Sequence, residues 1–207
     1  SMLKALAAAL VLLAVLLCDY YYFLYCVIAA ILIMVWRAFS TKEWRFWLTK
    51  PYLAAFATFG GACLMSSGIL IGSLLSLNRR DPFWGAHDPL EFSLDLLAPF
   101  IPGGHWRFAD LTEFYWSGLP GNINESSVYM GLSVVFLISF AWHKRGLLQS
   151  RHPSYNLWFG LLLFFMLMSL GPALHIFGKR VYSGIMPYDL LQMMIPPLAL
   201  SGCPVRM

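Results

Sequence analysis

The chain has 207 residues, of which 59% are hydrophobic and only 12% are charged, and its mean hydropathy is +0.68. Soluble domains carry about 25% charged and about 45–50% apolar residues, so a soluble chain of this composition would lack the polar surface to cover its core. The net charge of +4 does not indicate a nucleic-acid-binding protein, because the basic residues flank apolar segments, where membrane topology explains them. The composition therefore predicts a membrane protein.

The first 77 residues contain three apolar stretches. Two of them, within residues 3–36, are separated by Asp19 and three tyrosines. One continuous helix over both would be about 50 Å long at about 1.5 Å per residue and would bury Asp19 in the bilayer. A transmembrane hairpin with Asp19 and the tyrosines at the interface avoids both problems. The third span, residues 52–77, contains small residues that let helices approach closely. Residues 1–77 are thus predicted to form three transmembrane helices.

The second half of the chain predicts two further spans within residues 128–177. The first is Val128–Trp142 and the second is Leu157–Phe177, which contains a Gly-Pro pair expected to kink or end the helix near Leu170. Residues 178–207 contain further prolines that argue against a spanning helix, so we predict an external interfacial segment there. Because its last residues form no closing element, we expect the chain to continue in a longer protein.

The fold class predicted is an all-α polytopic membrane protein with about five transmembrane helices and one long external loop that carries a short amphipathic helix. Basic residues gather in Arg37–Lys50 and His143–His152, which both fall in the cytoplasm if the N-terminus is inside. This places the protein in the cytoplasmic (inner) membrane, with the loop 78–127 and the C-terminal segment outside.

The loop 78–127 holds seven of the ten acidic residues of the chain. Asp88, Glu91 and Asp95 are spaced by three and four residues, so a helix beginning at the Asp88-Pro89 step would place all three on one face. Their mutual repulsion predicts a general base or a divalent cation held by Asp88 and Glu91, which makes the three carboxylates the candidate catalytic residues. The alternative is the solvated face of a short amphipathic helix whose leucines lie on the membrane.

Five further residues of the loop are candidates for substrate binding. His105, Trp106 and Arg107 follow a Gly-Gly pair and would present a proton shuttle, a stacking surface for a sugar and a phosphate ligand; the alternative is an interfacial anchor. Asn124 and Glu125 would contact a polar substrate, or else belong to the start of a helix.

His175, at the outer end of the last predicted span, is better explained by helix capping or a structural hydrogen bond than by ligand binding. The sequence contains no HExxH, GxSxG, Walker A or Rossmann motif, so the common soluble enzyme classes receive no support.

Several phrases, in their order along the chain, resemble the middle portion of large bacterial membrane glycosyltransferases of the GT-C type. They are Leu17–Tyr21, Ser93–Pro102, Asn124–Gly131, Leu170–Leu174, Met186–Leu191 and Pro204–Arg206.

The resemblance implies an enzyme that moves a sugar from a polyprenyl-phosphate donor to an acceptor outside the cytoplasmic membrane. Family members usually carry the catalytic carboxylate in the first external loop, whereas the first outward turn here is only Asp19–Tyr22. We therefore expect an internal fragment or a shortened relative without the complete active site.

Two other functions remain open. One is a non-catalytic membrane subunit that packs against other subunits and lipids in a larger complex, favoured by the short spans and by the missing catalytic loop. The other is a transporter, which the near absence of charges within the spans disfavours.

Overall fold

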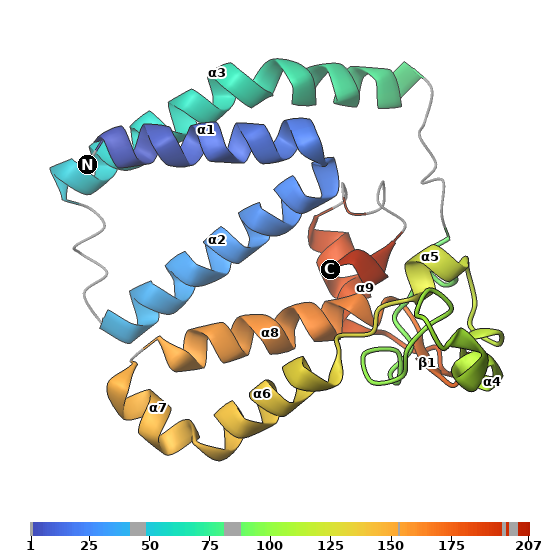
Figure 1. Ribbon diagram of the computed structural model, residues 1–207. Coiled ribbons are helices and arrows are strands. Elements are labelled where there is room, and N and C mark those ends of the chain that lie inside the picture. The colour runs from blue at the N-terminus through green and yellow to red at the C-terminus, as the bar shows by residue number, and fades with distance from the viewer. Residues whose placement is uncertain (1, 42–48, 81–87, 153, 196–197, 199–202) are drawn as a thin grey trace. The chain divides into compact units, whose positions relative to one another are not determined.

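The computed structural model divides into two compact units, residues 1–83 and 84–207, and each is described by itself (Figure 1). The structure describes residues 2–41, 49–80, 88–152, 154–195, 198 and 203–207. Parts of the predicted basic segment Arg37–Lys50 and of the loop 78–127 lie outside these residues.

The described residues of unit 1 form three helices, and α1 contacts both of the others. They are α1 (Met2–Cys18), α2 (Tyr20–Thr41) and α3 (Lys50–Arg80). The break between α1 and α2 falls at Asp19, where the sequence predicts a turn. The backbone N–H of Tyr21 donates to Oδ1 of Asp19 at 2.7 Å, and this bond satisfies one of the free amides at the start of α2.

The prediction of five transmembrane helices is wrong. Within the described residues, only Tyr20–Ser40 is long and apolar enough to cross a membrane. The apolar helices α6 (Leu132–His143) and α8 (Tyr155–Ser169) have 12 and 15 residues. They are about 18 and 22 Å long, against a hydrocarbon core of about 30 Å. The predicted orientation, with the N-terminus inside and loop 78–127 outside, was derived by assuming five spans. It stays a prediction.

A tertiary hydrogen bond and a local glycine turn explain why the two predicted spans are cut short. Before α6, the N–H of Met130 donates to the carbonyl of Pro99 at 3.1 Å, and Gly131 has a φ of 87°, so the chain is held extended until Leu132. After α8, Gly171 has a φ of 71° and reverses the chain. The helix end near Leu170 agrees with the Gly-Pro pair, but the residues beyond form a strand, so the unit is not all-α either.

Unit 2 carries the other elements of the described chain. The helix α7 (Arg145–Arg151) joins α6 to α8 (Figure 1), and the hydroxyl of Tyr155 donates to the carbonyl of Ala141 at 3.1 Å across this bend. The remaining short elements are the 3-10 helix η2 (Ala109–Thr112), α4 (Glu113–Trp116), α5 (Ile123–Ser126), β1 (Leu174–Ile176), β2 (Lys179–Tyr182), α9 (Pro187–Met194) and the 3-10 helix η4 (Pro204–Arg206).

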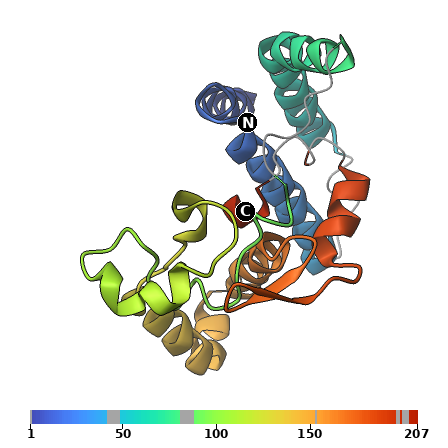
Figure 2. The same cartoon turned by 90° about the vertical axis from the view of Figure 1, so that its right-hand side faces the viewer.

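The strands β1 and β2 form an antiparallel hairpin in which Ile176 pairs with Lys179. Its two-residue turn, Phe177-Gly178, has φ angles of 58° and 72°, as a type I′ turn requires. Figure 2 shows this hairpin running into α9. The turn is unusual because its first position holds phenylalanine, a residue that rarely adopts a positive φ.

The core of unit 2 brings together segments far apart in the sequence. Leu94, Ala98 and Val205 form a buried cluster, and Val128 and Leu170 pack against it. Backbone hydrogen bonds fix the same arrangement: the N–H of Leu94 donates to Ser169 at 2.9 Å, and that of Val205 to Phe92 at 3.1 Å. Residues 92–94 are therefore hydrogen-bonded both to the end of α8 and to the C-terminal residues.

Candidate functional site

The three predicted carboxylates do not share a helical face. Residues 88–95 form a series of turns rather than the predicted helix. Asp88 does begin a turn, as its Oδ1 accepts the N–H of Leu90 at 2.9 Å. Asp88 and Glu91 are exposed, whereas Asp95 is only 4% exposed. The helix prediction failed because Phe92, Ser93 and Leu94 are drawn into the core, which pulls Asp95 inside with them.

Asp95 connects three parts of unit 2 through its carboxylate. Its Oδ1 accepts the hydroxyl of Tyr115 at 2.9 Å and the N–H of Leu97 at 3.0 Å. Its Oδ2 accepts the N–H of Gly178 at 2.8 Å. The backbone beside it also pairs with β1, since the N–H of Leu96 donates to the carbonyl of His175 at 2.9 Å. A buried carboxylate with this many donors is well satisfied.

The environment of Tyr115 shows how closed this site is. The side chain is almost fully buried, and its ring contacts Phe177 edge-on at 5.5 Å. Burial raises the pKa of the Tyr115 hydroxyl far above its usual range, and the hydrogen bond to Asp95 and the charge of Asp95 raise it further. The hydroxyl therefore stays a donor to Asp95 over the physiological pH range.

His175 is the third buried ionisable group of the site, after Asp95 and Tyr115, at 5% exposure. Its Nδ1 has no hydrogen-bond partner within the described structure. Burial lowers the pKa of His175; Arg180 lowers it too, while Asp95 and the backbone carbonyl of Ala173 oppose the shift. His175 lies in β1 and therefore does not cap a helix, and the structural hydrogen bond expected from the sequence is not found at its Nδ1.

The predicted substrate-binding residues lie in and next to the turns that follow Gly103. His105 Nε2 lies 2.8 Å from Oδ1 of Asn124, so these two candidates are in contact. The indole N–H of Trp106 instead donates to Oγ1 of Thr112 at 2.9 Å. Arg107 is exposed, and its guanidinium lies 5.6 Å from the centre of the Phe108 ring.

The Gly-Gly pair that precedes these residues is not a free hinge. A Cβ at Gly103 would lie 2.4 Å from Oγ of Ser127. Gly103 is therefore required for close packing against the segment that follows α5, and it fixes His105 near Asn124.

Glu125 pairs with a residue near the end of the chain. Both carboxylate oxygens accept hydrogen bonds from Arg206, through Nε at 3.0 Å and through Nη2. The two side chains are 16% and 33% exposed. Asn122 caps α5 by accepting the N–H of Glu125 at 3.0 Å, which agrees with the helix-start interpretation of this phrase. The ion pair between Glu125 and Arg206 connects α5 to η4, so Glu125 makes a structural contact.

No group of three or more metal-ligating side chains occurs among the described residues. Asp95 lies inside the fold and cannot complete a shared site with Asp88 and Glu91. The divalent cation expected at those two carboxylates stays a prediction.

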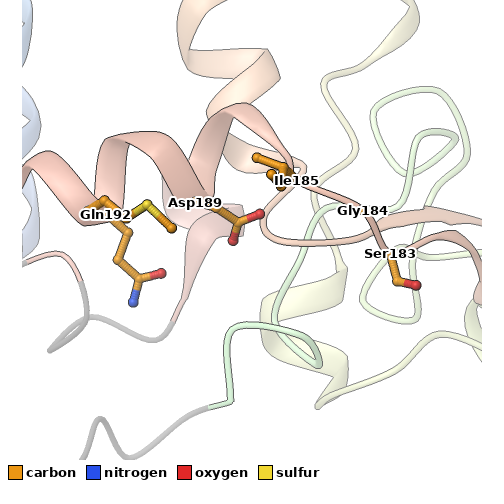
Figure 3. Close-up of a pocket in the computed structure, with 6 residues that line it drawn as sticks. Ser183, Gly184, Ile185, Asp189 and Gln192 are labelled. Carbon is orange, nitrogen blue, oxygen red and sulfur yellow. The ribbon is translucent and has the colours of Figure 1, made fainter.

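Unit 2 has two notable hollows. An open groove of about 640 Å³ lies between the β2–α9 connection and α9. Asp189 and Gln192 project into it from α9, opposite Ser183 and Gly184 (Figure 3). Asp189 also accepts the N–H of Met186 at 2.8 Å and so caps its own helix. The second hollow, about 190 Å³, is apolar and lies between α8 and the segment that contains Leu94 and Pro99.

Sequence reasoning missed three residues that organise the site: Tyr115, Gly178 and Arg206. Gly178 had a readable signal, because glycine readily adopts the positive φ that a two-residue hairpin turn requires. Tyr115 and Arg206 had none, because their partners Asp95 and Glu125 are 20 and 81 residues away.

No protein-family model, curated protein or solved structure matches this chain.

Proposed function

We propose that this chain is a non-catalytic membrane subunit, anchored by α2, whose apolar helices α6 and α8 pack against another protein in a membrane complex. The observation that carries the proposal is α6. Its twelve residues include no charged side chain before His143, all are described, and none is buried.

The exposed surface of α6 is too apolar to face water. Phe136, Leu137 and Phe140 are all exposed, as is Trp142 at its end. Contiguous apolar patches of this kind mark contacts with a protein or a membrane. The helix α6 is too short to span a bilayer alone. Its start is held to Pro99 by the hydrogen bond from Met130, and its end continues into α7. A partner protein beside or within the membrane therefore accounts better than lipid for its exposed apolar surface.

The helix α8 extends the same surface. Trp158, Leu163 and Leu167 are exposed on it, while Leu161 and Met168 face the core. One side of α8 therefore holds unit 2 together, and the other is left for an external partner.

The hydrogen bonds of the acidic groups favour a structural role. Asp95 and Glu125 each accept bonds that hold two segments of unit 2 together, and Asp189 caps its own helix. A general base must be able to reach a substrate proton, and the buried Asp95 cannot. The phrases that resemble GT-C enzymes include residues that hold unit 2 together, among them Asp95, Glu125 and Arg206.

A second candidate is a GT-C-like transferase that moves a sugar from a lipid-phosphate donor to an extracytoplasmic acceptor. It is favoured by the exposure of Asp88 and Glu91, the two candidate carboxylates that the core does not bury. Sugar transfer by the purified protein, lost in Glu91→Gln without a change in stability, would establish this alternative.

Photo-crosslinking in native membranes tests the proposal. A benzophenone amino acid at position 137, in the middle of α6, is expected to crosslink to a second polypeptide. The matched control is position 113, which is exposed but belongs to α4, and it is expected to give no such product. Crosslinks from position 137 to lipid alone would show that the bilayer covers α6 and would remove the subunit proposal.

A further inference from the structure

We propose that the turn around α7 binds the headgroups of anionic lipids through three basic side chains. These are Lys144, Arg145 and Arg151, which together we call the basic turn. The inference rests on the membrane anchoring in the proposed function. It adds a ligand class, the phosphates of lipids, and a place where unit 2 meets the membrane surface.

The three side chains of the basic turn are exposed on one broad side of a helix. Helical hydrogen bonds continue through both ends of α7, because the N–H of Leu148 donates to the carbonyl of Lys144 at 3.1 Å and that of His152 to Leu148 at 2.8 Å. Lys144 and Arg151 are seven residues apart, about two turns, and so lie on the same side. Arg145 follows Lys144 by about 100° around the helix axis, so the three charges share a sector about 120° wide.

No carboxylate neutralises this sector within the described structure. The sequence has no Asp or Glu between Glu125 and Asp189, and Glu125 is paired with Arg206 in the one salt bridge of the described residues. Figure 1 shows α7 at the opposite end of α8 from α9, which carries Asp189, and from β1. The other carboxylates of unit 2 lie in residues 88–113, at the same end as β1. The basic turn therefore complements an anionic layer.

Aromatic side chains form the next layer beyond the basic turn. The guanidinium carbon of Arg145 lies 4.6 Å from the centre of the Trp142 ring. Trp142 stacks on Phe159 with ring centres 4.8 Å apart, and Tyr155 stacks on the same ring at 6.1 Å. These contacts join the last turn of α6 to the start of α8. Tryptophan and tyrosine favour the headgroup depth of a membrane, so a measured contact places the charge beside an interfacial aromatic belt.

The order of side chains away from α7 matches the layers of a membrane. The charges come first, then Trp142 and Tyr155, and then the apolar lengths of α6 and α8. A bilayer presents phosphates, interface and hydrocarbon in this order, and the proposed partner of α6 would lie at hydrocarbon depth. An acidic protein surface would complement the charges but would not account for the aromatic belt behind them. Anionic lipid fits all three layers.

Lipid titration followed by native mass spectrometry tests the proposal. The full chain in detergent is titrated with phosphatidylglycerol and, separately, with phosphatidylcholine, and wild type should bind phosphatidylglycerol more tightly. Lys144→Gln with Arg151→Gln should raise the dissociation constant for phosphatidylglycerol about 25-fold, at roughly fivefold per basic residue. This variant leaves Arg145 on Trp142. The matched control, Lys179→Gln with Arg180→Gln, removes the same charge from β2 and should leave the dissociation constant unchanged.

The charge-conserving variant, Lys144→Arg with Arg151→Lys, should bind phosphatidylglycerol as wild type does. Equal affinity of wild type for the two lipids would overturn the proposal and leave an acidic protein as the ligand to seek. An equal loss of affinity in both neutral variants would overturn it too, because the attraction would then follow net charge and not the basic turn.

A label at position 31 separates this inference from the proposed function. Ile31 is exposed on α2, the proposed anchor. In nanodiscs of equal parts phosphatidylglycerol and phosphatidylcholine, oxygen should relax a nitroxide at this position more than a water-soluble nickel chelate does. A lipid signal at 31 without a preference for phosphatidylglycerol overturns the inference alone, whereas a water signal at 31 overturns the anchor as well.

Discussion

At Asp95, one carboxylate accepts hydrogen bonds from Leu97, Tyr115 and Gly178. Asp95→Ala leaves these donors buried without an acceptor, at about 1–3 kcal/mol each. We expect the free energy of unfolding of the full chain in detergent to fall by at least ~3 kcal/mol. Asp95→Asn should cost less, because an amide oxygen at the Oδ1 position still accepts from Leu97 and Tyr115.

The matched control for Asp95 is Glu91→Gln, at an exposed carboxylate four residues earlier. It should change the free energy of unfolding by no more than about 0.5 kcal/mol. A stably folded Asp95→Ala protein would show that the carboxylate is free for chemistry.

Gly178 is confined by its φ of 72° and by its neighbour Gly118, whose carbonyl oxygen would lie 2.0 Å from an added Cβ. Gly178→Ala should therefore destabilise unit 2 by more than ~2 kcal/mol, from left-handed strain of about 1–2 kcal/mol and the displaced backbone. Gly146→Ala is the contrasting variant, since Gly146 lies within α7 with open space around it. It should stabilise the protein by about 0.5–1 kcal/mol. Thermal unfolding of both variants tests this, and equal effects would contradict it.

The buried His175 predicts a pH dependence of stability. Burial holds its pKa in the folded protein below its usual value, which is about 6.5 in the unfolded chain. Above about pH 6.5 both states carry a neutral ring, and as the pH falls below this value the unfolded state binds the proton first, so the free energy of unfolding decreases. His175→Gln should remove this part of the slope between pH 7 and 5. An identical slope in variant and wild type would argue against a buried neutral ring.

At the scale of elements, Glu125 and Arg206 join α5 to η4 across 81 residues of sequence. The pair is partly exposed, so we expect a coupling energy of about 1 kcal/mol rather than the larger value of a buried pair. A double-mutant cycle with Glu125→Gln and Arg206→Gln measures it, and high salt should reduce it. A coupling energy of zero would mean that the pair of Glu125 and Arg206 does not stabilise the contact between α5 and η4.

The sequence predicts those element boundaries that local chemistry controls. The break at Asp19, the cap at Asn122 and the end of α8 near Leu170 follow from acceptor side chains and from a Gly-Pro pair. The late start of α6 does not, because it depends on a hydrogen bond to Pro99 in a distant segment. The five-span prediction failed at such places, where tertiary contacts override an apolar run.

The candidate site shows the same difference between features set by local chemistry and features set by tertiary contacts. Asp88 and Asp95 look equivalent in the sequence pattern, yet one begins an exposed turn and the other is buried. What separates them is the packing of Phe92 and Leu94, together with the donor groups of Tyr115 and Gly178. No spacing rule in a single sequence brings those residues together.

At the scale of the whole molecule, the described chain combines one membrane-length helix in unit 1 with exposed apolar helices in unit 2. Asp95 and Glu125 each hold two segments of unit 2 together, and the apolar surface of α6 is exposed. The proposed role as a membrane subunit rests on these features.

The most direct test is the native mass of the protein extracted from its own membranes in mild detergent. We expect wild type to migrate with a partner, and the double substitution Leu137→Glu with Phe140→Glu on α6 to release a single chain. Leu111→Glu, at an equally exposed leucine in η2, should leave the complex intact. A wild-type protein that extracts as a single chain would contradict the central claim that α6 packs against a partner.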